Sequence, residues 1–200
     1  MKKIISLAFL FVIAGCNQQQ SSPESGLQSR ASRIDWKQQF ESSLPLLGHR
    51  NWIVVADKAF PQQNAAGIEY INTDEELLPV LEFVLGKINA STHVRPIIFR
   101  DKELEFITED QVKGVGAFRT LSEKAFHSSA TPKESPVGKA GAFQTLLHDS
   151  VFVKLDAASK LFRVLVLKTN GTIPYSSVFL QLDCAYWNAN QEHQLRESMK

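Results

Sequence analysis

The chain has 200 residues, of which 44% are hydrophobic, and its 22 Lys and Arg against 21 Asp and Glu leave a formal net charge of +1. This length favours a single folded domain, and this hydrophobic fraction suits a globular core. The balanced charge lacks the basic footprint of a nucleic-acid-binding protein, so no nucleic acid is expected as a partner.

The N terminus has the organisation of a bacterial export signal. Two lysines precede a mostly apolar run over residues 4–13, which is shorter than the roughly 20 residues of a transmembrane helix. Ile13-Ala14-Gly15-Cys16 then resembles the lipobox of bacterial lipoproteins, in which the cysteine is lipidated and becomes the new N terminus. We therefore predict that residues 1–16 are a lipoprotein signal and that Cys16 anchors the protein to a membrane of the cell envelope, facing the periplasm or the cell exterior. The alternative is an ordinary secretory signal with an incidental cysteine.

A flexible tether is predicted over residues 17–31, which are rich in Gln and Ser and nearly without apolar side chains. The folded domain is then residues 32–200. Lipidation of Cys16 would leave Cys184 as the only cysteine of this domain, so no intramolecular disulfide is expected. Cys184 follows an apolar strand pattern and is predicted to be a small buried residue.

The folded domain begins with a helix and two short strands. Ser32 or Asp35 is expected to cap the helix, and Pro45 makes its end irregular. Residues 52–56 form a short, β-branched apolar run between polar residues, which is typical of a buried strand. A second strand is predicted over residues 68–71.

The next predicted element is a helix with an apolar face that extends to about residue 88. Thr73 and Glu76 have the spacing of a capping box before it. Pro79 conflicts with this arrangement, because beyond the first turn a proline costs a backbone hydrogen bond. We therefore expect the helix to start nearer Leu78 or to be kinked there.

A strand over residues 94–99 follows, with Pro96 tolerable near its beginning or at a sheet edge. A helix is predicted over residues 110–126, and the longest loop over residues 128–141. The pattern after this loop is ambiguous.

In that ambiguous part, residues 151–153 suggest a strand, and Asp156 suggests the cap of a short helix through Lys160. Strands are predicted over residues 161–167 and 175–182, and the polar tail is expected to be helical or frayed. Strands and helices therefore alternate along much of the chain. This order predicts a single layered α/β domain with a mainly parallel central sheet and helices packed on it.

Two polar residues bracket the first predicted strand. His49 stands at its entrance and Asp57 at its exit. Open α/β sheets bind ligands beyond the carboxyl ends of their strands, which is where Asp57 falls in a parallel sheet. A histidine titrates near neutral pH and suits proton transfer on a polar small molecule. The alternatives are a hydrogen-bonded surface histidine and an aspartate that forms a turn or caps a helix.

The segment from Gly48-His49 through the apolar strand to Asp57 and Pro61 resembles a signature of the ribose pyranase and fucose mutarotase family. That signature is Gly-His-x-Asp, a hydrophobic strand, and Asp-Ala-x-x-Pro. Residues 174–180 resemble the family's closing Tyr-x-Asn followed by an apolar strand. The two motifs stand in the family's order, and the similarity runs from about residue 44 to residue 182.

The resemblance implies a cofactor-free isomerase that interconverts the ring forms of a free monosaccharide. It assigns the catalytic acid to His49 and sugar binding to Asp57, Tyr175 and Ser177. It also implies a ring-shaped homo-oligomer in which a neighbouring subunit completes each pocket. The chemistry requires neither a metal nor a nucleotide.

Three departures from the family pattern leave a second hypothesis open. Asn51 replaces the aspartate of Gly-His-x-Asp, and Ser177 replaces the asparagine of Tyr-x-Asn. The family's ribose members also contribute a second histidine, and His148 is near that position without a secure alignment. The alternative is a non-catalytic monosaccharide-binding lipoprotein that keeps the pocket. A third possibility is an interaction module that uses the fold as a scaffold.

The other histidines are scattered without the spacing of metal ligands. Trp36, Trp52 and Trp187 are candidates for stacking on a sugar ring, although aromatic residues at such positions more often pack in the core. Arg50 and Lys58 flank the first motif and would suit an anionic sugar, unless they are simply solvated.

Overall fold

The computed structural model of the protein describes residues 35–128 and 143–200. The predicted signal with Cys16, the tether and most of the predicted loop over residues 128–141 lie outside the described residues. Within the described part of the chain, no helix is long and apolar enough to cross a membrane.

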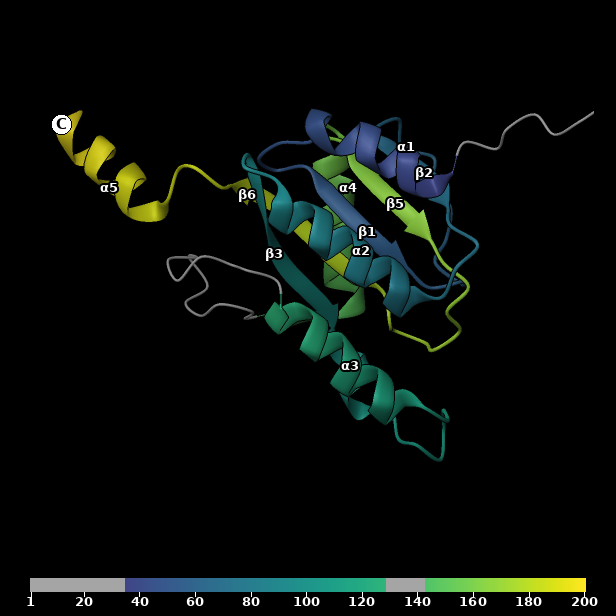
Figure 1. Ribbon diagram of the computed structural model, residues 1–200. Helices are drawn as coiled ribbons and strands as arrows, with labels where there is room; N and C mark the ends of the chain where they lie inside the picture. Colours follow the sequence, from purple (N-terminus) through teal and green to yellow (C-terminus); the bar gives the residue numbers. More distant parts are fainter. Residues whose placement is uncertain (1–34, 129–142) are drawn as a thin grey trace, which may run out of the picture. The chain divides into compact units, whose positions relative to one another are not determined.

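A six-stranded sheet with the order β2-β5-β1-β6-β3-β4 forms the centre of the described domain (Figure 1). Every neighbouring pair is parallel except the two that involve β6, which runs antiparallel to both β1 and β3. The predicted α/β fold with a mainly parallel sheet is therefore confirmed. The strands are β1 (Trp52–Ala56), β2 (Ile68–Asn72), β3 (Val94–Asp101), β4 (Phe143–Leu146), β5 (Val164–Lys168) and β6 (Val178–Cys184).

Helices cover both faces of the sheet. On one face, α1 (Trp36–Ser43), α2 (Leu77–Ala90) and α3 (Val115–Ser128) pack on side chains that include Ile53 and Val55. On the other face, α4 (His148–Ser159) packs on side chains that include Val54. All five residues of β1 are buried as a result. The apolar run over residues 52–56 is thus the buried central strand that the sequence predicted.

The start of α2 agrees with the first of the two predicted arrangements, a helix that starts near Leu78. The helix begins at Leu77, so Pro79 is its third residue and lies in the first turn. Backbone N–H groups of the first turn have no partner within a helix, and a proline there loses no hydrogen bond. The predicted conflict is therefore absent. The predicted capping box is wrong, because Glu76 is the N-cap without a side-chain bond and Thr73 donates to the carbonyl of Lys168.

Helix α3 begins at Val115, five residues later than predicted. Gly114 has a φ of 85°, in the left-handed region that favours glycine, and this conformation separates the preceding turns from the helix. The Glu109 carboxylate accepts hydrogen bonds from the N–H groups of Gly114 and Gly116. These local bonds hold residues 109–114 outside the helix.

The segment from residue 148 to residue 159 is one helix, so the predicted strand over residues 151–153 and the predicted cap at Asp156 are wrong. This helix buries the apolar residues Val151, Leu155 and Ala158, and their spacings of four and three fit a helix rather than a strand. Between Val151 and Leu155, Val153 is 69% exposed. The short apolar run concealed the helical period.

The two ends of the described domain follow the sequence more closely. Asp35 caps α1, and a 3-10 turn containing Pro45 follows the helix, so the predicted irregular end is confirmed. The tail forms α5 (Ala189–Ser198), none of whose residues is buried. Cys184 is half-buried, and not fully buried as predicted.

Candidate active site

Polar residues gather at the edge where β1, β3, β4 and β5 end. Asp57 follows β1, Asp101 is the last residue of β3, and His148 begins α4 shortly after β4. Because β6 runs in the opposite direction, the segment before it, with Tyr175 and Ser177, lies at the same edge. We call this the carboxyl edge. It is where open α/β sheets bind ligands.

Asp57 and Ser177 contact each other directly at this edge. The Ser177 hydroxyl donates to Asp57 Oδ2 at 2.7 Å and accepts the backbone N–H of Asp57 at 3.0 Å. Asp57 Oδ1 accepts the backbone N–H of Ala59 at 2.8 Å. Ser177 is only 1% exposed, so its hydroxyl orients the carboxylate of Asp57. The structure thus brings together two of the predicted site residues.

His148 forms a close pair with a buried carboxylate. Its Nδ1 lies 2.7 Å from Oδ2 of Asp101, whose side chain is fully buried, while the imidazole is 34% exposed. Burial raises the pKa of Asp101 to about 6, an effect opposed by the hydrogen bond and charge of His148 and assisted by the charges of Glu103 and Asp57. Once ionised, Asp101 accepts a proton-bearing Nδ1, which leaves Nε2 as the ring nitrogen for proton exchange.

Aromatic contacts fix the orientation of the imidazole. The ring of Tyr175 stands edge-on to His148 with centroids 5.2 Å apart, and Phe152 does the same at 4.8 Å. Tyr175 has a left-handed backbone with a φ of 59°, which is uncommon for a bulky residue. Such strain is retained where the surroundings hold a residue in one place, often at a functional site.

A pocket of about 250 Å³ opens where these side chains meet. Its polar groups are the carboxylate of Asp57, the imidazole of His148 and the phenol of Tyr175, and its apolar walls are Ala59, Phe60, Pro61 and Pro174. A carboxylate, an imidazole and a phenol can together bind hydroxyl groups and move a proton.

Two lysines donate hydrogen bonds beside this pocket. The Lys168 amine donates to the carbonyl oxygens of Asp57 and Lys58 at 3.0 Å each. Burial lowers the pKa of this amine, while the nearby charge of Asp57 raises it. Lys58 donates to the side chain of Asn170 at 2.7 Å. Lys58, a candidate for binding an anionic sugar, thus pairs with an amide of the protein.

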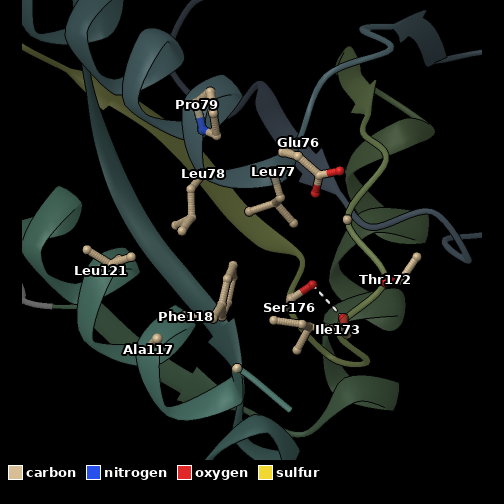
Figure 2. A pocket seen from close by; sticks show the side chains of 12 residues that line it. Glu76, Leu77, Leu78, Pro79, Ala117, Phe118, Leu121, Thr172, Ile173 and Ser176 are labelled. Carbon is tan, nitrogen blue, oxygen red and sulfur yellow. Dashed lines mark hydrogen bonds between the residues drawn. The ribbon is translucent and has the colours of Figure 1, made fainter. Parts of the chain in front are cut away.

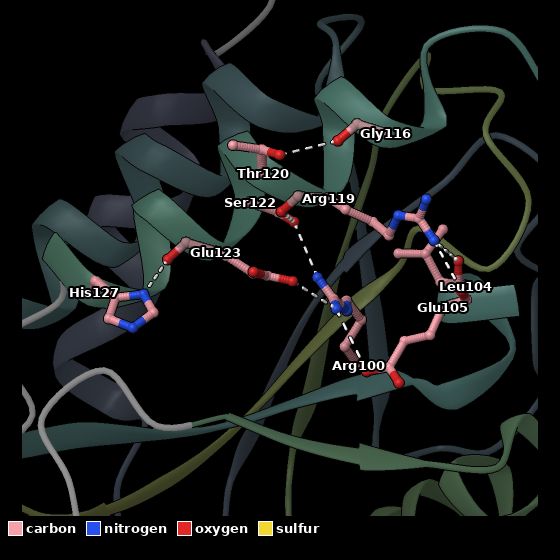
Figure 3. A network of polar contacts seen from close by, with 9 residues as sticks. All are labelled: Arg100, Leu104, Glu105, Gly116, Arg119, Thr120, Ser122, Glu123 and His127. Atoms are coloured by element: carbon pink, nitrogen blue, oxygen red, sulfur yellow. Dashed lines mark hydrogen bonds and ion pairs between the residues drawn. The ribbon is translucent and has the colours of Figure 1, made fainter. Parts of the chain in front are cut away.

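Buried Arg100 directly precedes Asp101 in β3. Its side chain bonds to residues of α3 (Figure 3). Its guanidinium donates to the Ser122 hydroxyl at 3.3 Å and to Glu123 at 3.0 Å, both on α3. A guanidinium with 1% exposure would be costly to bury without such partners. The network therefore fixes the strand that presents Asp101 to His148.

A second pocket near this edge, of about 360 Å³, lies between α2, α3 and the loop before β6 (Figure 2). Its walls are mostly apolar, with Leu77, Leu78 and Phe118 among them. The hydroxyl of Ser176 donates to the carbonyl of Ile173 at 2.6 Å. Glu76 is its one titratable side chain, so it lacks the paired groups that proton transfer needs.

His49 lies at the opposite edge of the sheet, before β1. The five residues of β1 span roughly 16 Å at the usual rise of a strand, so one chain does not bring His49 to Asp57. His49 Nδ1 lies 3.1 Å from Oδ1 of Asp183, and the Arg50 side chain donates to His49 Nε2 at 3.1 Å. Asp183 supplies the carboxylate partner that Asn51 does not.

Asn51 has a structural position in the turn before β1. Its side-chain oxygen accepts the N–H of Gly48 at 2.7 Å, and its amide donates to the carbonyl of Arg163 at 3.2 Å. The family's aspartate would lack this second donor. Asn51 in place of aspartate thus suits the hydrogen bonds to the backbone of Gly48 and Arg163. Asn51 does not line the pocket at the carboxyl edge.

The sequence indicated Asp57 and Tyr175 because each stands beside a recognisable strand motif. It did not indicate Asp101, and His148 was noted without a secure position. These two residues are 47 positions apart, and the pair forms only because β3 and β4 are neighbours. Within residues 35–128 and 143–200, no group of three His, Cys, Asp or Glu side chains is arranged to hold a metal ion.

Fold and site together define an α/β protein with a small polar pocket at the carboxyl edge of its sheet. No protein-family model matches the sequence, and no curated protein is significantly similar to it. Solved structures with a similar fold are RbsD and fucose mutarotases.

RbsD from Bacillus subtilis, in complex with D-ribose, is 18% identical, with a TM-score of 0.45 over 72% of this chain and 89% of that one. The fucose mutarotase of Streptococcus pneumoniae, in complex with L-fucose, is 18% identical, with a TM-score of 0.47 over 75% and 96% of the two chains. FucU from Bifidobacterium longum is 15% identical, with a TM-score of 0.47 over 72% and 91%. These names are those of the family that the two motifs resemble, and the likeness concerns the fold.

Proposed function

We propose that the protein binds a free monosaccharide in the pocket at the carboxyl edge and interconverts its ring forms, with His148 as the proton-transfer group. The observation that supports this most directly is the pair of His148 and buried Asp101, which meets Asp57 and Tyr175 around one pocket of about 250 Å³. The resemblance of the motifs around Asp57 and Tyr175 to the pyranase and mutarotase family supports the same conclusion.

Ring-form exchange needs one proton to leave the anomeric hydroxyl and one to reach the ring oxygen. In the proposed reaction, Nε2 of His148 accepts the hydroxyl proton, the carbon–oxygen bond of the ring opens, and the imidazolium protonates the former ring oxygen. Reclosure reverses these steps, so nothing is oxidised and no co-reactant is consumed. Ionised Asp101 stabilises the transient imidazolium across its 2.7 Å contact. General acid–base catalysis of this kind contributes roughly 10²- to 10⁴-fold.

Asp57 and Tyr175 orient the sugar in this proposal. The Asp57 carboxylate is held by Ser177 and by the N–H of Ala59, so it is preorganised as an acceptor for sugar hydroxyls. The apolar walls, with Phe60 and Pro61, contact the C–H faces of the sugar. Lipidation of Cys16, which remains a prediction, would place this activity at a membrane of the bacterial cell envelope.

The assignment of the catalytic acid to His49 also remains a prediction. Its separation from Asp57 by the length of β1 means that His49 reaches the same sugar only from a second copy of the chain. The predicted homo-oligomer would supply that copy.

The second candidate function is sugar binding without catalysis. One observation favours it: the single hydroxyl of Ser177 donates to Asp57. Ser177 therefore provides fewer hydrogen-bonding groups for the sugar than the amide of the family's asparagine would. The affinity would then come from Asp57 and Tyr175.

Saturation-transfer NMR of D-ribose, L-fucose and related free sugars tests these alternatives. The expected result is faster ring-form exchange with the protein and at least a 10²-fold loss in His148→Gln. His127→Gln is the matched control, because His127 lies on α3, away from the pocket, and bonds the carbonyl of Glu123.

If the sugar signals broaden but ring-form exchange is not accelerated, the protein binds the sugar without catalysing exchange, and the second candidate function is correct. A His148→Gln protein that retains the full rate would remove His148 from the proposed mechanism. If no sugar of the panel shows either effect, both candidate functions are wrong for this protein.

A further inference from the structure

A further, larger hollow lies at the edge of the sheet opposite the carboxyl edge, called here the amino edge. It is bounded by the turn at residues 49–50, the end of β6 and α5. Its volume is about 670 Å³, more than twice the 250 Å³ of the pocket at the carboxyl edge. We propose that this hollow, called here the β6–α5 hollow, is a separate carbohydrate site that binds an oligosaccharide segment through Trp187 and Tyr186. It does not depend on the ring-exchange activity proposed above, but it requires that no second copy of the chain covers the hollow at His49.

Two exposed aromatic residues at consecutive positions of the chain line the β6–α5 hollow. Tyr186 is 74% exposed and Trp187 is 40% exposed, whereas Trp36 and Trp52 are buried at 6% and 3%. Of the three tryptophans that were candidates for stacking on a sugar ring, only Trp187 is therefore exposed enough to contact a ligand. Tyr and Trp combine an apolar ring with a polar group, which suits ligands that present both C–H faces and hydroxyls.

The indole of Trp187 is held in place by hydrogen bonds. Its Nε1–H donates to Glu192 at 2.9 Å, and Glu192 also accepts from Arg196 at 2.7 Å. These two bonds, that of Trp187 first, lower the pKa of Glu192. Asn188 and Gln191 form a capping box that fixes the start of α5 directly after Trp187. A ring fixed before binding costs less entropy when a ligand stacks on it.

Polar groups held by hydrogen bonds line the same hollow. Arg95 donates twice to Oδ2 of Asp183, at 2.9 and 2.7 Å, and Oδ1 of Asp183 contacts His49. Arg95 is only 6% exposed, so this pair is firmly seated. Arg50 joins these hydrogen-bonded residues by donating to His49 Nε2. Its backbone is left-handed, with a φ of 74°, at the turn before β1.

The charges around the hollow favour an uncharged saccharide over an anion. Two arginines, Arg50 and Arg95, and two carboxylates, Asp183 and Glu192, line the hollow, so the lining itself carries no net positive charge to attract a phosphate or a polyanion, although Glu192 also pairs with Arg196 outside the lining. The guanidinium and carboxylate groups of the lining instead provide donors and acceptors for sugar hydroxyls. The hollow's volume exceeds that of the carboxyl-edge pocket by enough to take more than one sugar ring.

The test measures binding of maltotriose, cellotriose, xylotriose and chitotriose, with glucose as the monosaccharide arm, by isothermal titration calorimetry and tryptophan fluorescence. Because Trp36 and Trp52 are buried, a fluorescence change on binding reports chiefly on Trp187. We expect a trisaccharide to bind more tightly than glucose. Trp187→Ala and Tyr186→Ala should each weaken that binding about tenfold.

Phe106→Ala is the matched control, since Phe106 is also an exposed aromatic, at 70%, and lies outside the hollow. Tyr175→Ala changes the other site and should leave trisaccharide binding intact. Ring exchange of free monosaccharides should be unchanged in Trp187→Ala, so failure of the first proposal and failure of this one are read separately.

Three results would overturn the proposal. The first is that no probe in the panel binds the wild-type protein. The second is equal binding by Trp187→Ala and the wild type. The third is a change in oligomer size on light scattering when Trp187 or Tyr186 is removed, which would mean that another copy of the chain covers these rings.

Discussion

Asp101 is the residue whose ionisation the fold opposes most clearly. Its side chain is fully buried, and burial raises its pKa from 3.8 to about 6. The folded state therefore holds this proton to a higher pH than the unfolded state does. Between about pH 4 and pH 6 the unfolded chain releases the proton first, so the free energy of unfolding falls as the pH rises through this window.

We predict that Asp101→Asn removes this decrease in the free energy of unfolding with rising pH. The difference in unfolding free energy, wild type minus variant, should decrease by up to a few kcal/mol from pH 4 to pH 7 and then level off. Urea unfolding at several pH values measures it. Asp110→Asn is the control, because the Asp110 side chain is fully exposed. A pH-independent difference for Asp101→Asn would mean that Asp101 titrates in the folded protein as it does in the unfolded chain.

At the residue scale, the sequence found the part of the site that depends on short-range order. Asp57 follows a buried strand and Tyr175 precedes another, and each position can be seen in a motif of a few residues. The contact between Asp101 and His148 depends on the pairing of β3 with β4, which no local pattern encodes. Likewise, Asp183 reaches His49 across 134 positions. Both histidine–carboxylate pairs found among residues 35–128 and 143–200 are therefore products of tertiary structure.

At the element scale, β1 and α2 show how far periodicity is sufficient. Residues 52–56 read as a buried strand because nothing polar interrupts them, and they are buried throughout. The six buried residues of α2 follow helical spacing from Leu77 to Ile88. The same reasoning failed for α4, where Phe152 and Val153 make the local run look continuous although, of residues 151–153, only Val151 is buried. Short apolar runs do not distinguish a strand from one face of a helix.

Gly86 offers a prediction about α2. It is exposed within the helix, and a Cβ added there would meet no atom within 4 Å. Glycine in a helix costs roughly 0.5–1 kcal/mol relative to alanine, because it loses more backbone freedom on folding. Gly86→Ala should therefore raise the free energy of unfolding by about that amount, as measured by urea denaturation.

Gly114→Ala is the opposite control for Gly86→Ala. A Cβ at Gly114 also meets no atom within 4 Å, but its φ is 85°. An alanine forced into this left-handed conformation destabilises the turn before α3. If both substitutions were stabilising, local backbone conformation would not be the cause.

At the scale of the whole molecule, the alternation of strands and helices was sufficient to predict a mainly parallel α/β sheet. The position of β6 was not predictable in this way. The last strand in sequence inserts between β1 and β3 and runs against both, and this order depends on contacts between segments far apart in the chain. Its reversal has a functional consequence, because it brings Tyr175 and Ser177 to the edge where the parallel strands end.

The sheet separates two polar sites, and this separation makes the predicted homo-oligomer testable. In one chain, His49 is at the amino edge and His148 is at the carboxyl edge. If a neighbouring copy places its His49 against the pocket that contains His148, then His49→Ala and His148→Gln should each be inactive alone. Co-assembled in equal amounts, they should regain about a quarter of the wild-type ring-exchange rate, since a mixed site draws its two histidines from different copies.

Asp57→Asn mixed with His148→Gln is the control for this rescue. Asp57 and His148 line the same pocket of the same chain, so no mixture of these two variants contains an intact site. Ring exchange should then stay absent, and light scattering should show that both mixtures form oligomers of equal size. Full activity of His49→Ala on its own would give a different result: the pocket at the carboxyl edge would be complete within one chain, and His148 with Asp101 would supply the proton transfer without a partner.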